Sequence, residues 1–476
     1  MPRLPDRRRF LGAATAGALA PLCRGAADRK WNFLLILADD LGWTDLGCFG
    51  STYYRTPHID RLAAQGVRFT DAYAACTVCS PTRAAVLTGQ YPARLRVTDW
   101  IPGLEPPGMK LRQPEWTRHL PHEETTIAEL LKPAGYSSAS IGKWHLGNED
   151  SYPEKHGFDR NVAGTHAPSP KTYFAPYGIP TLEEGPPGEY LTDRLTDEAL
   201  GYLSGLGGKP FFLYLAHFAV HLPIQGKADA ARAYAARIRP GQSHSHPVYA
   251  AMIESLDDSV GRLLKKLDES GRADRTVVIF TSDNGGVIKP QHITSNEPLR
   301  GEKGTLYEGG IRVPLIIRWP GVTKPGSVSH VPVASIDFLP TIAEIAGLPL
   351  PPRGVDGKSL VPLLRGGGGL EREALYWHYP HYNLHQALTP LAPSGAVRKG
   401  DFKLIEQYED GRLELFNLKD DPGERYNLAA ALPGKARELQ ADLAAWRKSA
   451  GAQMPVPDPG NYDPRKTEEW KRSRNR

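Results

Sequence analysis

The chain has few cysteines, little net charge beyond its N-terminus, and no long apolar run. Its 476 residues include only four cysteines, too few for a framework of disulfides. No apolar segment approaches the roughly 20 residues that span a bilayer, so we expect no stable membrane insertion. The formal net charge is +5, but residues 1–27 hold five arginines and one aspartate and the remainder carries only +1. Such a chain gives no electrostatic reason to expect a nucleic-acid partner.

Residues 1–27 have the pattern of an export signal. Three arginines at 7–9 precede Phe-Leu and a run of small and apolar residues at 12–22, similar to a twin-arginine signal. Small residues at 25–27 offer a cleavage region, whereas Cys23 is a poor lipid-attachment site because Pro-Leu precedes it. We expect an exported protein, periplasmic or secreted; the alternative is a basic tail that is retained.

Most of the chain alternates between short β-branched or aromatic runs and longer segments of helical period. Helices are predicted at 126–131, after a threonine cap, and at 249–267. The predicted strands are Asn32–Leu37, Ser138–Ile141, Phe211–Ala216, Thr276–Thr281 and Val313–Arg318. This alternation predicts an α/β fold with a large mixed, mainly parallel sheet sandwiched by helices.

Four consecutive glycines at 366–369 mark a boundary in the chain. Beyond them, strands are predicted at 396–407 and 412–418, joined by an Asp-Gly hairpin turn. A helix follows with Leu439 and Leu443 on one face, and the last residues read as an extended tail. The C-terminal region is therefore predicted to be a smaller antiparallel sheet plus a helix.

Two predicted strands end directly in oxygen-bearing side chains. Asp39 and Asp40 follow the first strand, and Asp283 and Asn284 follow the strand at 276–281. Chemistry in open parallel sheets collects at the carboxyl ends of the strands, and four hard oxygen donors suit Ca²⁺ or Mg²⁺. The alternative is that these side chains cap the helices that follow.

A helix is predicted to begin at Ser80 and Pro81, because proline favours the first helical turn, and this leaves Cys79 at the helix N-terminus. Unpaired N–H groups and the helix dipole favour an anion there, and Arg83 lies one turn further on. The pattern indicates an anion site beside a nucleophile; the alternative is a buried structural thiol. A disulfide between Cys48 and Cys76 is left open.

The run from Cys79 to Arg83, Cys-Ser-Pro-Thr-Arg, followed by Leu-Thr-Gly at 87–89, resembles the signature of the formylglycine-dependent (type I) sulfatases. These arylsulfatase-like enzymes belong to the alkaline phosphatase superfamily. Thr82 departs mildly from the usual serine or alanine. The resemblance extends over residues 31–430 and implies an alkaline phosphatase-like fold.

The resemblance implies a catalytic domain at 28–370, a C-terminal subdomain with the tail at 371–476, and hydrolysis of a sulfate ester. A maturation enzyme would oxidise Cys79 to formylglycine, whose hydrate would attack sulfur and form a covalent sulfoenzyme. One divalent cation, usually Ca²⁺ with Mg²⁺ as an alternative, would be held by Asp39, Asp40, Asp283, Asn284 and position 79. The implied catalytic residues are Cys79, Arg83, Lys143, His145, His221 and Lys303.

Two assignments stay open at this stage. His217 competes with His221 as the histidine near the leaving oxygen. The family often adds a serine to the sulfate site near the Gly-Phe-Asp segment, and Thr165, His166 and Ser169 are all candidates here.

The substrate is less readable from the sequence. The resemblance favours a sulfated carbohydrate of galactose or N-acetylgalactosamine type, with aryl sulfates as further substrates. Aromatic and polar residues that could bind sugar, or could simply pack, are Asp99, Trp100, Trp377, His378 and His381. One rival function is a phosphonate monoester or phosphodiester hydrolase of the same superfamily, although Asn284 favours sulfate. The other is an inactive sulfatase fold that only binds glycans. The sequence does not indicate the oligomeric state.

Overall fold

A computed structural model describes residues 30–288, 292–383 and 392–474. The predicted export signal and Cys23 lie outside these residues. Among the residues described, no helix is both long and apolar enough to cross a membrane.

An eight-stranded mixed sheet forms the centre of the fold, in the order β10-β2-β9-β8-β1-β7-β5-β6. Five of its neighbouring pairs are parallel, and β9 is antiparallel to both β2 and β8. In that order the strands are Ser327–Ser329, Val67–Phe69, Leu315–Arg318, Thr276–Ser282, Asn32–Ala38, Phe211–Ala216, Ser137–Gly142 and Arg160–Val162. The predicted α/β architecture is confirmed.

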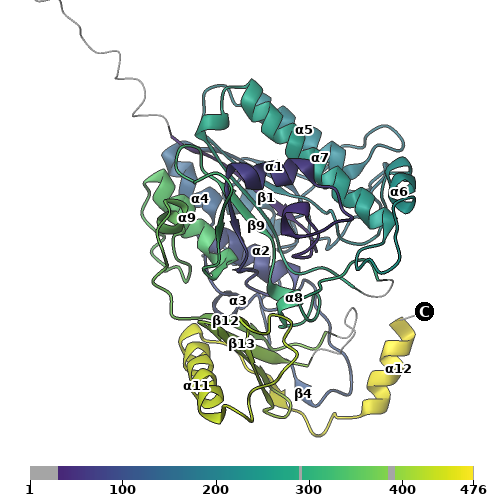
Figure 1. Ribbon diagram of the computed structural model, residues 1–476, viewed down its shortest axis with the longest axis vertical. Coiled ribbons are helices and arrows are strands. Elements are labelled where there is room, and N and C mark those ends of the chain that lie inside the picture. The colour runs from purple at the N-terminus through teal and green to yellow at the C-terminus, as the bar shows by residue number, and fades with distance from the viewer. Residues whose placement is uncertain (1–29, 289–291, 384–391, 475–476) are drawn as a thin grey trace, which may run out of the picture. The chain divides into compact units, whose positions relative to one another are not determined.

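Helices cover both faces of this sheet, which explains why its central strands are continuously apolar. On β1, Leu34 and Ile36 pack with α1, α5 and α7, whereas Leu35 and Leu37 pack with α2, α4 and α9. These helices, seen in Figure 1, are α1 (Pro57–Gln65), α5 (Leu191–Gly205), α7 (Pro247–Glu269), α2 (Cys79–Thr88), α4 (Ile127–Leu131) and α9 (Phe338–Ala346). Shorter helices are α3 (Pro92–Leu95), α6 (Ala228–Ala235), α8 (Glu308–Ile311) and α10 (Val361–Leu364).

The C-terminal region forms a four-stranded antiparallel sheet with a helix, as predicted (Figure 1). Its elements are β12 (Leu375–Tyr379), β13 (Ser394–Lys399), β14 (Phe402–Gln407), β15 (Leu413–Asn417) and α11 (Pro433–Ala450). One face, with Leu404, packs against Leu439 of α11. The other face, with Trp377, packs against Tyr73 and Ile311 of the region that precedes it in the chain. The domain boundary near residue 370 stays a prediction.

Two details of the C-terminal prediction were wrong. The segment 396–407 is not one strand, because Gly400 adopts a positive φ of 61° and turns the chain between β13 and β14. The end of the chain is not extended throughout, since α12 (Pro464–Arg474) follows Asp463, whose Oδ1 accepts a hydrogen bond from the Arg465 amide.

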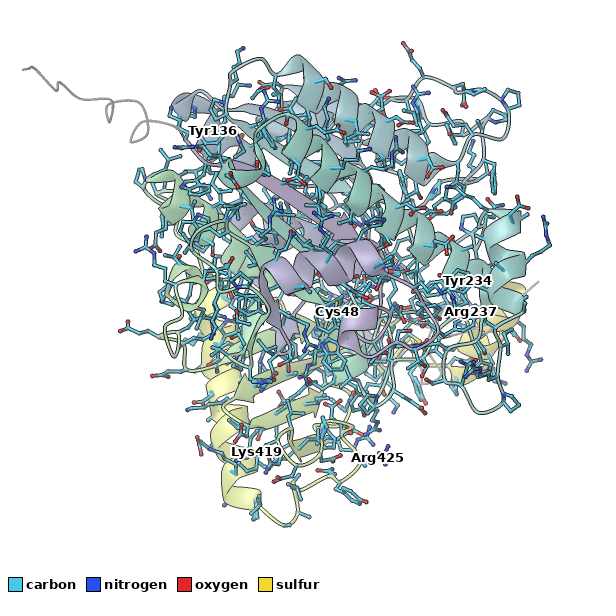
Figure 2. The ribbon with its side chains drawn as sticks, turned by 45° about the horizontal axis from the view of Figure 1, so that its top comes forward. Cys48, Tyr136, Tyr234, Arg237, Lys419 and Arg425 are labelled. Atoms are coloured by element: carbon cyan, nitrogen blue, oxygen red, sulfur yellow. The ribbon has the colours of Figure 1, made fainter. Side chains whose placement is uncertain are left out.

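Two further short ladders pair distant segments. They join β11 (Val333–Ala334) to β3 (Ala72–Tyr73) and β16 (Val456–Pro457) to β4 (Leu111–Arg112). The three cysteines within the described residues are free, so the Cys48–Cys76 disulfide is not formed. Cys48, labelled in Figure 2, lies in the short 3₁₀ turn Gly47–Phe49.

Candidate active site

Four neighbouring parallel strands bring the predicted site residues together. The order β8-β1-β7-β5 and the registers Ala38 with Ser282 and Gly142 with Ala216 align the carboxyl ends of these strands. The side chains that follow the four strands are Asp283 and Asn284, Asp39 and Asp40, His217 and His221, and Lys143 and His145. Residues separated by up to 245 positions in the sequence therefore meet at one edge of the sheet.

The oxygen-bearing residues form one buried cluster. The Asp40 amide donates to Asp283 Oδ1 at 3.2 Å, and Asn284 Nδ2 donates to Asp40 Oδ1 at 2.8 Å. Within the described part of the chain, Asp39 Oδ1 and Asn284 Oδ1 have no hydrogen-bond partner. Buried polar atoms without partners are rare in native proteins, so these two oxygens fit the ligands of a cation.

Three cationic side chains neutralise this cluster. Lys143 Nζ lies 2.7 Å from Asp39 Oδ2, Lys303 Nζ lies 2.7 Å from Asp40 Oδ1, and Arg83 Nη2 lies 2.8 Å from Asp283 Oδ2. All of these groups are buried. Three cations thus face three carboxylates, and an added divalent cation would make the cluster positive and suited to an anionic substrate.

The pKa values of Asp39 and Asp40, the two carboxyls that follow β1, are shifted in opposite directions. Burial raises the pKa of Asp39 to about 8, although Lys143 opposes this shift. Burial also acts on Asp40, but Lys303 and His221 outweigh it and hold the pKa of Asp40 below its ordinary value. The two carboxyls therefore differ in which effect prevails, burial at Asp39 and the neighbouring cationic groups at Asp40.

Cys79 occupies the first position of α2, one residue earlier than the predicted helix start. Val78 is the extended N-cap residue, and the whole helix is buried. Cys79 Sγ lies 3.3 Å from His145 Nδ1. Burial raises the pKa of the Cys79 thiol, and the neighbouring Lys143 and Lys303 oppose this shift.

The tautomer of His145 is set by a backbone group. His145 Nε2 lies 2.5 Å from the Ile101 carbonyl oxygen, which can only accept a hydrogen bond. The proton therefore resides on Nε2, and the lone pair of Nδ1 faces Cys79. Burial, with a smaller contribution from Lys143, lowers the pKa of His145 well below its usual value. The acceptor nitrogen of His145 is thus directed at residue 79.

The two histidines after β7 lie in different surroundings. His221 Nε2 is 3.5 Å from Asp40 Oδ2, and Nδ1 donates to the Leu222 carbonyl at 3.0 Å. His217 Nε2 instead contacts Ser259 Oγ on α7 at 2.9 Å. The geometry therefore places His221, rather than His217, at the cluster.

The three candidates for an additional sulfate ligand lie in different surroundings. Thr165 is buried, and its carbonyl accepts a hydrogen bond from the His145 amide at 2.9 Å. His166 is exposed and Ser169 half-buried. Thr165 is the candidate with a contact to a site residue, through its backbone only.

The residues predicted to bind sugar are largely used for packing. Trp377 Nε1 donates to the Ala74 carbonyl, and both ring nitrogens of His378 and of His381 have hydrogen-bond partners. Asp99 is buried and accepts a hydrogen bond from Tyr379 Oη at 2.7 Å. Trp100 is half-buried. The geometry of Trp377, His378, His381 and Asp99 is therefore explained by packing and internal hydrogen bonds.

Sequence reasoning missed the role of Ile101. Its carbonyl orients His145, and its amide donates to Ser80 Oγ at 3.1 Å. Both contacts use backbone atoms, so no side-chain type at this position could have indicated them.

Comparison of the sequence with known proteins identifies the family of this chain. Residues 31–348 match the model of the Sulfatase family, and residues 301–448 match the family described as N-sulphoglucosamine sulphohydrolase, C-terminal. A protein named Sulfatase from Formosa agariphila is 37% identical over 506 residues, covering 88% of this chain and 89% of the relative. Human N-acetylgalactosamine-6-sulfatase is 34% identical over 450 residues, covering 84% and 82%.

A solved structure agrees with these matches. Ps i-CgsB in complex with k-i-k-neocarrahexaose aligns with a TM-score of 0.72 and 28% identity, covering 88% of this chain and 93% of the other. The alkaline phosphatase-like fold expected from the resemblance is confirmed. The chain belongs to the sulfatase family and is a sulfuric ester hydrolase.

Proposed function

We propose that this sulfatase removes sulfate from a carbohydrate, of galactose or N-acetylgalactosamine type, with formylglycine at position 79 and one Ca²⁺ ion. The observation that carries the proposal is Cys79 at the start of α2, 3.3 Å from a proton-accepting nitrogen of His145. Two similar proteins support the substrate class, since one is named for N-acetylgalactosamine 6-sulfate and the other was solved with a neocarrahexaose.

The acidic cluster fits a hard divalent cation. Asp39 and Asn284 each offer an unpartnered oxygen within the described residues, and Asp40 and Asp283 complete the donor set. Oxygen donors of this kind are those preferred by Ca²⁺ and Mg²⁺. When bound, the cation would supply positive charge for the sulfate oxygens.

The cationic side chains prepare the site for a sulfate ester. Sulfate oxygens repel an incoming nucleophile, and fixed positive charge offsets that repulsion in the transition state. Lys143 and Lys303 are held by their carboxylate partners, and Arg83 Nη1 donates to the Lys143 carbonyl at 2.9 Å. Because these groups are already ordered, little reorganisation is needed when the substrate binds.

His145 and His221 are the residues that we assign to proton transfer. When formed, formylglycine supplies a hydrated aldehyde with two hydroxyls at position 79. His145 Nδ1 accepts a proton at that position, and the Ile101 carbonyl keeps the acceptor nitrogen facing it. We assign His221, beside Asp40, to the leaving alcohol oxygen.

The experiment compares substrates of three kinds with the matured enzyme. We expect 4-nitrophenyl sulfate and sulfated saccharides to be hydrolysed with higher kcat/KM than bis(4-nitrophenyl) phosphate. Faster turnover of the phosphodiester would favour the rival phosphonate or phosphodiester hydrolase. Binding of saccharides without hydrolysis, with formylglycine confirmed by mass, would favour an inactive glycan-binding protein.

We also propose that residues 1–27 direct export to the periplasm or beyond. A twin-arginine-like signal carries folded cargo, so a maturation enzyme would oxidise Cys79 in the cytoplasm before export. Cell fractionation of the full chain and of a chain beginning at residue 28 tests this. Equal cytoplasmic retention of both would contradict it.

A further inference from the structure

The loop after α3 connects the C-terminal sheet with the catalytic centre. Ile101 lies in this loop, and its carbonyl oxygen is 2.5 Å from His145 Nε2. Its amide donates to the Oγ of Ser80, the residue after Cys79, at 3.1 Å. The position of residues 98–102 therefore decides where the acceptor nitrogen of His145 points.

Two side chains at the end of the C-terminal strand β12 hold this loop. Tyr379, the last residue of β12, donates from Oη to Asp99 Oδ1 at 2.7 Å. His381 Nε2 lies 2.8 Å from Thr98 Oγ1. Asp99 Oδ1 also accepts a hydrogen bond from the Trp100 amide at 2.9 Å. Hydrogen bonds thus extend from β12 to the backbone of the loop.

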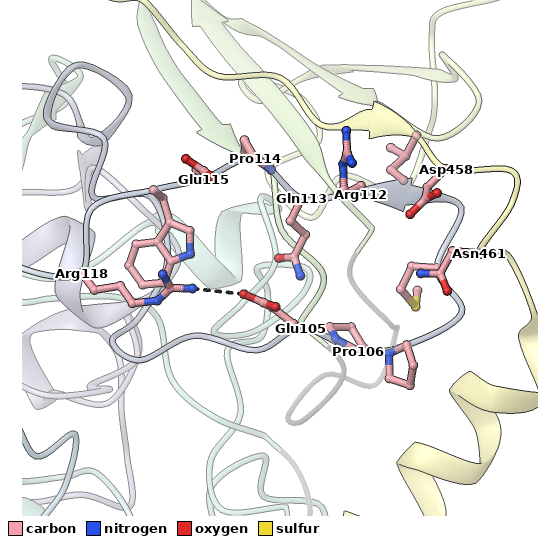
Figure 3. A pocket seen from close by; sticks show the side chains of 13 residues that line it. Glu105, Pro106, Arg112, Gln113, Pro114, Glu115, Arg118, Asp458 and Asn461 are labelled. Carbon is pink, nitrogen blue, oxygen red and sulfur yellow. Dashed lines mark hydrogen bonds and ion pairs between the residues drawn. The ribbon is translucent and has the colours of Figure 1, made fainter.

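A further contact to the loop lies at the protein surface. Arg118 Nε donates to the Pro102 carbonyl at 3.2 Å, and Arg118 Nη2 pairs with Glu105 Oε1 at 3.1 Å (Figure 3). The Arg118 side chain is 49% exposed and that of Glu105 is 80% exposed, and solvent weakens such ion pairs. Tyr379 and Asp99 are each 1% exposed, so their hydrogen bond is stronger and its loss is less easily compensated by water. The buried contact should therefore control the position of the loop.

The buried position of Asp99 also decides how this residue acts. Asp99 Oδ1 already has two hydrogen-bond donors, and the residue is not accessible to a substrate. The loop closes tightly beside it, because Gly103 has a φ of 82° and a Cβ atom there would lie 2.6 Å from Trp116 Cζ2. A loop packed in this way holds the Ile101 carbonyl in place before a substrate binds.

We propose that Asp99 and Tyr379 are positioning residues for the sulfatase reaction. They hold residues 98–101 so that the Ile101 carbonyl keeps the acceptor nitrogen of His145 directed at residue 79. The inference rests on the proposed role of His145 in proton transfer. It makes turnover depend on a strand of the C-terminal sheet.

The first test removes the hydroxyl of Tyr379. Tyr379→Phe keeps the ring that packs against His381, with ring centres 5.5 Å apart, and loses the hydrogen bond to Asp99. We expect kcat for 4-nitrophenyl sulfate, per molecule that contains formylglycine by peptide mass, to fall roughly 5- to 30-fold, the range that corresponds to one buried hydrogen bond. The matched control is Tyr408→Phe, which removes a tyrosine hydroxyl 2.8 Å from His378 Nδ1 in the same sheet and should leave kcat unchanged.

A double-mutant cycle shows whether the effect passes through His145. In a His145→Ala background, Tyr379→Phe should cause no further loss of kcat, because the ring that the loop orients is absent. An equal fold-loss in both backgrounds, or an equal loss in Tyr408→Phe, would overturn the positioning role alone. Wild-type kcat in His145→Ala itself would instead refute the proposed role of His145.

Two further measurements do not depend on the kinetics of Tyr379→Phe. Asp99→Asn keeps an oxygen that accepts from Tyr379 and Trp100, so its loss of kcat should be smaller than that of Asp99→Ala; equal losses would contradict the proposal. The NMR shifts of the His145 ring nitrogens, assigned by their disappearance in His145→Ala, should indicate a proton on Nε2 in the wild type and a mixture of tautomers in Asp99→Ala. Identical shifts in both proteins would overturn the proposal.

Discussion

Replacing Lys143 with methionine removes one of the positive charges that we assign to the sulfate site. Methionine retains much of the apolar stem, while Nζ, 2.7 Å from Asp39 Oδ2, is lost. Removing one preorganised charge-stabilising donor typically lowers kcat by roughly 10²- to 10³-fold, equivalent to about 3–4 kcal/mol of transition-state stabilisation. We expect a loss of kcat on this scale for Lys143→Met.

The variant should remain folded. Breaking a buried ion pair costs about 3–5 kcal/mol, but Arg83 Nη2 still lies 3.7 Å from Asp39 Oδ1, and its bond to the residue 143 carbonyl is unaffected. We therefore expect a cost of about 3 kcal/mol, within the 5–15 kcal/mol by which domains are usually stable. Urea unfolding in saturating Ca²⁺ measures this cost.

The assay is kcat with 4-nitrophenyl sulfate, corrected for the folded fraction. Lys403→Met is the matched control, because Lys403 is also buried and lies 2.9 Å from both Glu308 and Glu424, outside the site. It should lose stability without losing turnover per folded molecule. Turnover by Lys143→Met within a few-fold of wild type, or an equal loss in the control, would refute the reasoning.

Three further predictions concern the cation, the histidines and the effect of pH. Chelation should abolish turnover and Asn284→Ala should weaken Ca²⁺ binding measured by calorimetry; full activity of metal-stripped protein would exclude the cation. His221→Ala should lower kcat by about 10²-fold or more. His217→Ala should change kcat only a few-fold, because His217 Nε2 contacts Ser259 rather than the acidic cluster. A larger loss of kcat in His217→Ala than in His221→Ala would favour His217. Burial raises the pKa of Glu424 to about 7 from 4.5, so the folded state retains a proton that the unfolded state releases, and stability should fall as pH rises from about 4.5 to 7. Glu424→Gln should remove the decrease in the free energy of unfolding that is due to Glu424, on the order of 2 kcal/mol between pH 5 and pH 8. The measurement is urea unfolding over this pH range, and an identical pH dependence in both proteins would contradict this assignment.

The acidic half of the site was predictable because it depends on short-range patterns. Asp39 and Asp283 follow apolar strands directly, and parallel strands carry such residues to a common edge. The position of Cys79 at a helix start followed from the proline two residues later. Both predictions needed only local sequence and a general property of open sheets.

The features that sequence reasoning missed depend on tertiary contacts. The Ile101 carbonyl contacts His145 across 44 positions, and a backbone oxygen has no signature in the residue type. Trp377 and His378 are residue types that are typical of sugar-binding surfaces, yet both side chains are buried and form hydrogen bonds within the protein. Composition cannot separate these cases, because the same side chains serve packing and recognition.

The chemical state of Cys79 tests the central claim most directly. The enzyme is produced with and without a formylglycine-generating enzyme, and the mass of the peptide containing residue 79 is measured beside turnover of 4-nitrophenyl sulfate. We expect turnover to follow the fraction in which sulfur and two hydrogens have been replaced by oxygen. Cys79→Ala should abolish turnover, whereas Cys76→Ala should retain it. Full turnover from a preparation in which Cys79 is entirely the unmodified thiol would contradict the account.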